Sequence, residues 1–232
     1  MNLYNNKFTR RWNKWYRFHF VTPLLKKKLL NKDASILCNN CTAGFVCHDF
    51  GMQFNSPTIN LFFHGLDFFE FVEHLDYYLK QPLVQIPNPK YDPDAPDYPV
   101  AVLSGGGTGL KDIEIHFLHY NSFVEANEKW EERKKRINLD NLFLIWTFMG
   151  MDKDEELYHR AQALPVKNKV IFVNHPIDHS EYLDFFYIKG FEKQIGLGQL
   201  GEYMDLHGHR YYDQFDFVSW LNEGNEYGKA NA

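Results

Sequence analysis

Two uninterrupted apolar runs in the second half of the chain, Leu142–Phe148 and Val170–Val173, constrain the fold most strongly. Polar residues bound both runs, and each run is short enough for a single strand. A strand with one solvent-facing side alternates apolar and polar residues, so a run without alternation is typical of a strand buried on both faces. The sequence therefore predicts an α/β fold, a three-layer arrangement with a mixed, largely buried sheet flanked by helices.

Other segments carry weaker signals for helices and strands. Capping-box patterns predict a helix over Asp67–Lys80, begun by Asp67 and Glu70, and another from Ser122 to about Ile137. A hairpin is expected around the glycine-rich run from Ser104 to Gly109. The remaining expected strands are Ser35–Cys38, Thr58–Phe63, Leu83–Ile86 and Phe185–Ile188, with a helix near Phe215–Leu221 and loops at Asn39–Gly44 and 87–98.

Charge is distributed unevenly along the chain. Residues 1–32 hold nine Lys or Arg and no acidic residue, whereas the remaining residues hold 16 basic and 30 acidic ones, a net charge of −14. We therefore expect a basic aromatic segment at 1–33 and a single α/β domain at 34–232. Residues 5–31 read as one helix, or as two that break near Pro23. This helix either binds an anionic membrane surface or packs on the domain with its charges in solvent.

Composition excludes several classes of protein. No run of 18 uncharged apolar residues is present, and the first residues lack the pattern of a signal peptide. The three cysteines, all within ten residues, do not suggest a secreted disulfide framework. An acidic body argues against nucleic acid as a partner. We expect a cytoplasmic protein, peripheral at the inner membrane face if the basic segment binds lipid.

Two motifs suggest a zinc, redox or phosphate site, but neither matches the full pattern of such a site. Cys38-Asn39-Asn40-Cys41 matches C-x-x-C, yet no second pair follows, and we place this pair across a strand end and a loop, so neither zinc nor redox chemistry is favoured. The run Ser104–Gly109 matches neither phosphate-binding loop pattern. Asp92-x-Asp94 is the nearest approach to the paired carboxylates of a metal-dependent glycosyltransferase, but it lies in a proline-rich loop. We predict no metal site, and the cofactor is unknown.

Polar residues after predicted strands are better candidates. His116, His119 and Tyr120 end one predicted strand, and His175 follows another. In α/β folds, ligands bind at the carboxyl ends of strands, and histidine is suited to acid–base chemistry near neutral pH. Arg133 and Arg136 lie three residues apart on a predicted helix, from which they could hold a diphosphate. Each of these residues also has a structural explanation, as a hydrogen-bonded histidine or a solvated helix end.

Several stretches together resemble a bacterial family. They are Asn39-Asn40-Cys41 with Gly44, Asn55-Ser56-Pro57-Thr58, Tyr98-Pro99-Val100, the block from Asp112 through Trp130 and Arg133 to Asn138, and Leu164-Pro165 with Lys169–Phe172. The chain is similar to the domain-of-unknown-function family commonly labelled exopolysaccharide biosynthesis protein, whose members occur in capsule and lipopolysaccharide gene clusters. The resemblance implies an α/β fold and a pathway, without implying a reaction.

From this resemblance we expect a protein of surface-polysaccharide biosynthesis that transfers a sugar or an acyl group from a nucleotide sugar or an acyl donor. The alternative is a non-catalytic adaptor that binds a polysaccharide-assembly enzyme or the membrane surface. The expected catalytic residues are His116, His119 and Cys41. The expected substrate-binding residues are Asn40, Gly44, Asn55, Ser56, Tyr120, Trp130, Arg133, Arg136 and His175.

Overall fold

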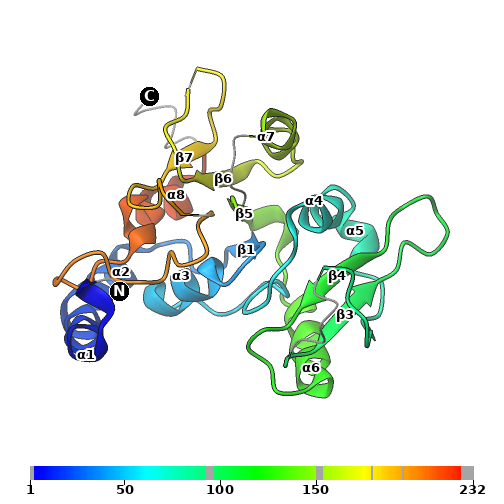
Figure 1. Ribbon diagram of the computed structural model, residues 1–232, viewed down its shortest axis with the longest axis horizontal. Coiled ribbons are helices and arrows are strands. Elements are labelled where there is room, and N and C mark those ends of the chain that lie inside the picture. The colour runs from blue at the N-terminus through cyan, green and yellow to red at the C-terminus, as the bar shows by residue number, and fades with distance from the viewer. Residues whose placement is uncertain (1–2, 92–96, 150–153, 179, 195, 226–232) are drawn as a thin grey trace.

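The structure is a computed structural model that describes residues 3–91, 97–149, 154–178, 180–194 and 196–225 (Figure 1). The strands are β1 (Ser35–Cys38), β2 (Val84–Gln85), β3 (Val100–Leu103), β4 (Ile113–His116), β5 (Leu142–Thr147), β6 (Asn168–Val173) and β7 (Phe185–Tyr187). The helices are α1 (Lys7–Tyr16), α2 (Thr22–Lys28), α3 (Thr42–Phe50), α4 (Gly65–Glu73), α5 (Leu75–Tyr78), α6 (Phe123–Lys134), α7 (Glu155–Gln162) and α8 (Phe217–Glu223). Short helical turns add Leu3–Asn5, Arg17–Val21, Leu139–Asn141 and Tyr211–Gln214.

A parallel sheet in the order β1-β5-β6-β7 forms the central layer. Successive side chains of a strand point to opposite faces, and here both faces are covered. Ile145 packs with residues of α3 and α8, whereas Leu144 and Trp146 pack with residues of α4 and α7. The two apolar runs are thus central strands buried on both sides, and the predicted α/β class is confirmed.

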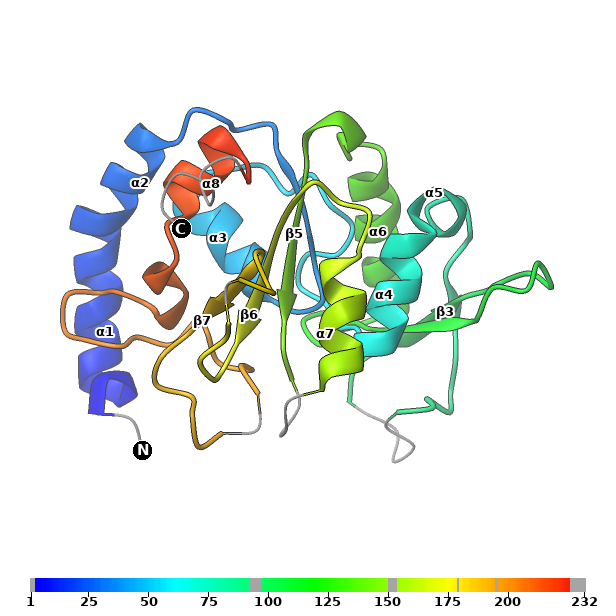
Figure 2. The same ribbon diagram turned by 90° about the horizontal axis from the view of Figure 1, so that it is seen from above.

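A second, antiparallel sheet in the order β2-β3-β4 lies beside α4 and α6 (Figures 1 and 2). The predicted hairpin is present, because β3 pairs with β4 from Val100 opposite His116 to Leu103 opposite Ile113. The strands are therefore divided between two sheets. The expected strand at Leu83–Ile86 is reduced to Val84–Gln85.

Three predicted local structures are wrong. The loop expected at Asn39–Gly44 contains the start of α3. The strand expected at Thr58–Phe63 is a turn followed by one antiparallel bridge, Phe62 opposite His116. The helix expected at Asp67–Lys80 breaks at His74, where φ is −123° and ψ is 39°, and so becomes α4 and α5.

The Asp67–Glu70 capping box is also absent. His64 is the N-cap of α4 and makes no side-chain cap. The Asp67 carboxylate instead accepts hydrogen bonds from the Glu114 amide at 2.7 Å and the Tyr91 hydroxyl at 2.8 Å, which ties α4 to β4. By contrast, Ser122 caps α6 as predicted by accepting from the Glu125 amide.

The N-terminal segment is helical from Lys7 to Lys28 and lies along one side of the molecule (Figure 2). Pro23 lies in the first turn of α2, directly after a π-helical turn, and the helical segment continues through it. A π-helical turn at Arg17–Val21 joins α1 to α2. This segment packs on the domain, which is one of the two arrangements expected for it.

Candidate active site at the carboxyl end of the parallel sheet

The connection from β1 to α3 places a cysteine at the start of a helix. Cys41 is the N-cap of α3 and follows β1 by three residues. Asn40 accepts a hydrogen bond from the Thr42 amide at 3.0 Å, so its side chain helps begin the helix. The loop therefore lies at the edge where the parallel strands end, and these strand ends point to the lower side of Figure 2.

The structure brings Cys41 and His119 together. The Cys41 sulfur lies 3.0 Å from Nε2 of His119, although 78 residues separate them in the chain. Cys41 is half-buried and the His119 side chain is exposed, so the pair is open to solvent on the histidine side. A thiol in hydrogen-bond contact with an imidazole is the arrangement that activates a cysteine nucleophile.

Burial sets the protonation state of the cysteines. It raises the pKa of the Cys41 thiol to about 11. It raises the pKa of Cys38 to about 12, although the amides of Asn40, Ala43 and Thr42 favour the Cys38 thiolate. At neutral pH Cys41 is therefore a thiol, and a base must take its proton before the sulfur attacks.

Asn39 fixes the loop to the neighbouring strand. Its side chain donates to the Thr147 carbonyl at 3.0 Å and accepts from the Thr147 amide at 2.9 Å. The amide group thereby copies a backbone pairing and extends the β1–β5 ladder by one step. Asn39 lies in a stretch that carries the family resemblance, but its role was not predicted, because a side chain that imitates a strand leaves no pattern in the sequence.

A close contact also shapes the first turn of α3. A Cβ added at Gly44 would lie 2.5 Å from Oδ1 of Asn60, so only glycine leaves room for this side chain. Asn60 has φ of 62°, a left-handed conformation that asparagine tolerates better than most residues. The sequence did not predict a role for Asn60. Its position in an apolar run at 59–63, where the chain has to turn, is the signal that could have found it.

Tyr120 links the Cys41–His119 pair to helix α6. The Tyr120 hydroxyl accepts a hydrogen bond from Arg133 at 2.6 Å, and Arg133 also donates to the Ile59 carbonyl at 2.8 Å. Burial raises the pKa of Tyr120, which keeps the hydroxyl neutral at physiological pH. Because Tyr120 directly follows His119, this buried contact restrains the segment that carries the histidine.

Arg133 and Arg136 line an open hollow of about 340 Å³ beside α6. Its other lining residues are Met52, Phe54, Lys129 and Glu132. Arg136 donates to Glu132 at 2.6 Å and to the Phe54 carbonyl at 2.8 Å. The two arginines therefore face one hollow, as their spacing suggested, but both already serve partners within the chain.

Three further predicted residues make contacts that stabilise the fold. Ser56 is buried against the Thr58 hydroxyl at 3.0 Å, and the Asn55 carbonyl accepts from Ser35. Trp130 is buried in the core against Phe71 and Phe117.

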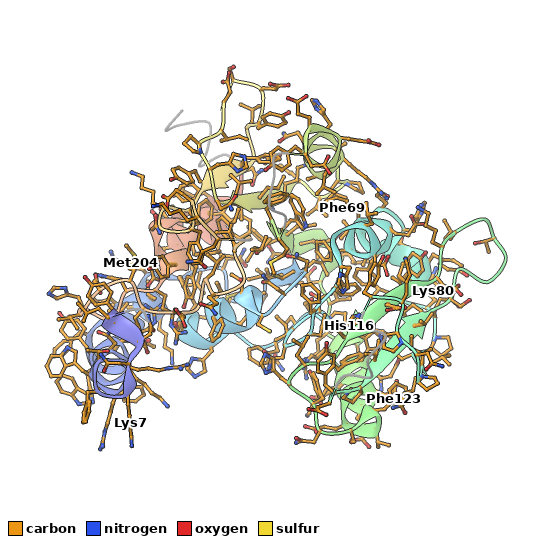
Figure 3. All side chains as sticks on the ribbon, in the orientation of Figure 1. Lys7, Phe69, Lys80, His116, Phe123 and Met204 are labelled. Atoms are coloured by element: carbon orange, nitrogen blue, oxygen red, sulfur yellow. The ribbon has the colours of Figure 1, made fainter. Side chains whose placement is uncertain are left out.

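The two other histidines predicted as site residues, His116 and His175, come from different strands. His116 ends β4 with Nε2 3.5 Å from Glu114, and Figure 3 places it among the elements β3, β4 and α6. His175 follows β6, where its ring stacks on Tyr158 and its Nε2 lies 3.1 Å from that hydroxyl. Asp92 and Asp94 lie outside the described residues.

Residues 13–222 match the family described as a domain of unknown function, DUF1919. The chain belongs to this family. It is also 41% identical over 212 residues to an uncharacterized protein of Haemophilus influenzae, a match that covers 90% of this chain and 94% of that protein. These similarities establish membership of a family of unknown function, and they do not tie that family to exopolysaccharide biosynthesis, which stays a hypothesis.

No helix within the described ranges has the length and apolar character needed to cross a bilayer. Within the same ranges, no three His, Cys, Asp or Glu side chains gather where they could hold a metal ion.

Proposed function

We propose that this protein transfers an acyl group in surface-polysaccharide assembly, with Cys41 as nucleophile and His119 as general base. The observation that carries the proposal is the 3.0 Å contact between the Cys41 sulfur and His119 Nε2 at the start of α3. Thiol nucleophiles with a histidine base are typical of acyl transfer through a thioester, so the pair favours an acyl group over a sugar. The polysaccharide acceptor rests on the family resemblance.

The reaction would proceed in two steps, acylation of Cys41 and transfer of the acyl group to an acceptor. The Cys41 sulfur attacks the carbonyl carbon of the donor while Nε2 of His119 takes the thiol proton. The bond to the donor's leaving atom then breaks, and His119 returns the proton to that atom. An acceptor hydroxyl attacks the resulting thioester and gives its proton to His119, so the Cys41 thiol is regenerated.

Other residues near the pair would hold it in place. Asn39 and Asn40 fix the loop that carries Cys41, and the Tyr120–Arg133 contact restrains the segment that carries His119. The cations beside the open hollow, Lys129 and Arg136, would attract a donor that bears phosphate groups.

The test uses p-nitrophenyl acetate, a small acyl donor that requires little specific recognition. Release of p-nitrophenol gives the acylation rate, and intact mass with peptide mapping locates the acetyl group. We expect one acetyl group, on Cys41 in the wild-type chain and on no residue in Cys41→Ala. Cys38→Ser is the matched control, because Cys38 is buried and should not react.

The histidine base has a separate readout. In His119→Ala the rate at neutral pH should fall by about 100-fold or more. The remaining reaction should rise about tenfold per pH unit toward the thiol pKa of about 11, since only thiolate can then attack. Equal rates for His119→Ala and wild type, or acetylation that survives in Cys41→Ala, would exclude this mechanism and leave the adaptor as the better hypothesis.

A further inference from the structure

The N-terminal helix packs on the protein with its polar side. Asn13, Arg17 and Thr22 are its buried polar residues. Asn13 donates to the Asp205 carbonyl at 2.7 Å, and Arg17 forms an ion pair with Asp49 at 2.6 Å. A surface helix of a globular protein normally turns its apolar stripe inward, so this arrangement is reversed.

The opposite side of the helix presents aromatic rings to solvent. The exposed fractions are 85% for Phe8, 50% for Trp12, 47% for Trp15 and 67% for Phe18. The rings touch one another along the helix, with centroids 5.3 Å apart for Trp12 and Trp15 and 5.8 Å apart for Trp15 and Phe20. Figure 3 shows the side chains of α1 spreading away from the rest of the chain. An apolar surface this continuous marks a binding face.

The π-helical turn keeps the aromatic side chains on one side of the helix along its length. The buried inward positions Asn13, Arg17 and Thr22 are four and then five residues apart, so in a helix of 3.6 residues per turn they would drift around the axis. A π turn contains more residues per turn, which cancels part of that drift. Tyr16, Phe20 and Leu24 consequently continue along the edge of the aromatic face and line a hollow of about 660 Å³ against the segment 207–219.

Charge identifies the occupant of this face. Lys7, Arg10, Arg11 and Lys14 are exposed on the same helix, and residues 1–32 contain no acidic residue. A second copy packed face to face would bring identical cations together, which disfavours a symmetric dimer. An anionic lipid surface satisfies both features, because aromatic rings reside at the headgroup level and Lys or Arg binds phosphate. The body, with a net charge of −14, would be repelled and would therefore point away from the lipid.

We propose that the exposed face of α1 and the π-helical turn docks the protein on an anionic membrane surface. This docking is independent of the acyl-transfer proposal, because its residues are not those of the Cys41–His119 site. It requires no spanning helix, since an amphipathic helix can lie in the plane of the interface.

The experiment is co-sedimentation of the full chain with vesicles of phosphatidylcholine plus phosphatidylglycerol, and with phosphatidylcholine alone. We expect binding to the mixed vesicles that declines as salt is raised, and much weaker binding to phosphatidylcholine. Phe8→Ser with Trp15→Ser should abolish binding without altering thermal unfolding, because both rings face solvent. Val124→Ser with Leu183→Ser is the matched control, since these exposed residues lie elsewhere, and it should bind as wild type does.

A charge series separates lipid from protein as the occupant. Lys7→Gln, Arg11→Gln and Lys14→Gln together should weaken binding by about 100-fold. The same change of net charge at Lys80, Lys135 and Lys189 should have little effect. Equal binding to both vesicle types would overturn the proposal. A wild-type dimer that becomes a monomer in Phe8→Ser with Trp15→Ser would overturn it as well, by assigning the face to a second copy.

Discussion

At the scale of single residues, Gly208 allows the C-terminal segment to approach the N-terminal helix. Its φ is +72°, and a Cβ there would lie 2.9 Å from the Arg17 amide nitrogen and 3.0 Å from the Asn13 carbonyl oxygen. The Gly208 carbonyl accepts from the Arg17 guanidinium at 2.9 Å. Both the conformation and the lack of a side chain are therefore needed at this position.

Gly208→Ala should lower the free energy of unfolding by at least about 2 kcal/mol, because left-handed strain and a backbone clash act together. Gly107→Ala is a close control. Gly107 also has φ of +72°, but no heavy atom lies within 4 Å of an added Cβ. That variant should lose only about 1 kcal/mol from strain. Chemical denaturation of both measures the difference, and equal losses would show that the close approach contributes nothing.

The candidate site shows what residue patterns can and cannot predict. Cys41 and His119 were each selected for their chemistry and their place near strand ends. Their contact was not predictable, because it joins two loops 78 residues apart. His116 was chosen for the same reasons, and Trp130 because it lies in the block that carries the family resemblance, yet both side chains are almost fully buried. A residue type that suits both a core and a site cannot be assigned until the topology is known.

At the scale of elements, the long apolar strands were predictable and the short buried helix was not. β5 and β6 follow uninterrupted runs, and α6 has Ser122 as a capping side chain. In α3 only Phe45 and His48 are exposed, so no amphipathic pattern appears, and the N-cap Cys41 makes no side-chain cap. Gly51, left-handed at the end of α3, was the remaining signal for this helix.

The junction of β1 and β5 gives a prediction at this scale. Asn39→Ala should leave the amide and carbonyl of Thr147 buried without their partner, which costs about 2 to 3 kcal/mol. Asn39→Asp can still accept from the amide but cannot donate to the carbonyl, so it should not restore stability. Urea denaturation checks both. Wild-type stability of Asn39→Ala would contradict the assignment of Asn39 as the link between the strands.

At the scale of the whole molecule, one buried arginine joins the first and last thirds of the chain. Arg17 forms ion pairs with Asp49 of α3 at 2.6 Å and with Asp213 near the C-terminus at 2.5 Å. Tyr212 donates to Asp49 and accepts from Arg17 at 2.9 Å. The buried polar side of the N-terminal helix therefore packs on the domain in one specific position. This position determines the direction in which the aromatic face points.

Arg17→Leu should lower the free energy of unfolding by about 3 to 5 kcal/mol, because it removes the nearest cation from the buried Asp49 carboxylate and from the partly buried Asp213 carboxylate. Burial alone would raise the pKa of Asp49, but the charges of Arg17 and Arg210 outweigh it and hold that pKa below its usual value. The folded state therefore binds the Asp49 proton less readily than the unfolded state does. Its contribution is complete above about pH 4 and is lost as the pH falls through the folded pKa.

Asp49→Asn removes this titration, so the stability difference between wild type and the variant should be largest near neutral pH and should shrink below about pH 4. Asp76→Asn, which removes the same charge from an exposed residue, should show a much smaller difference at every pH. Denaturation curves between about pH 2 and pH 7 measure both. A difference for Asp49→Asn that stays constant across this range would mean that the Arg17–Asp49 pair does not hold the helix in place electrostatically.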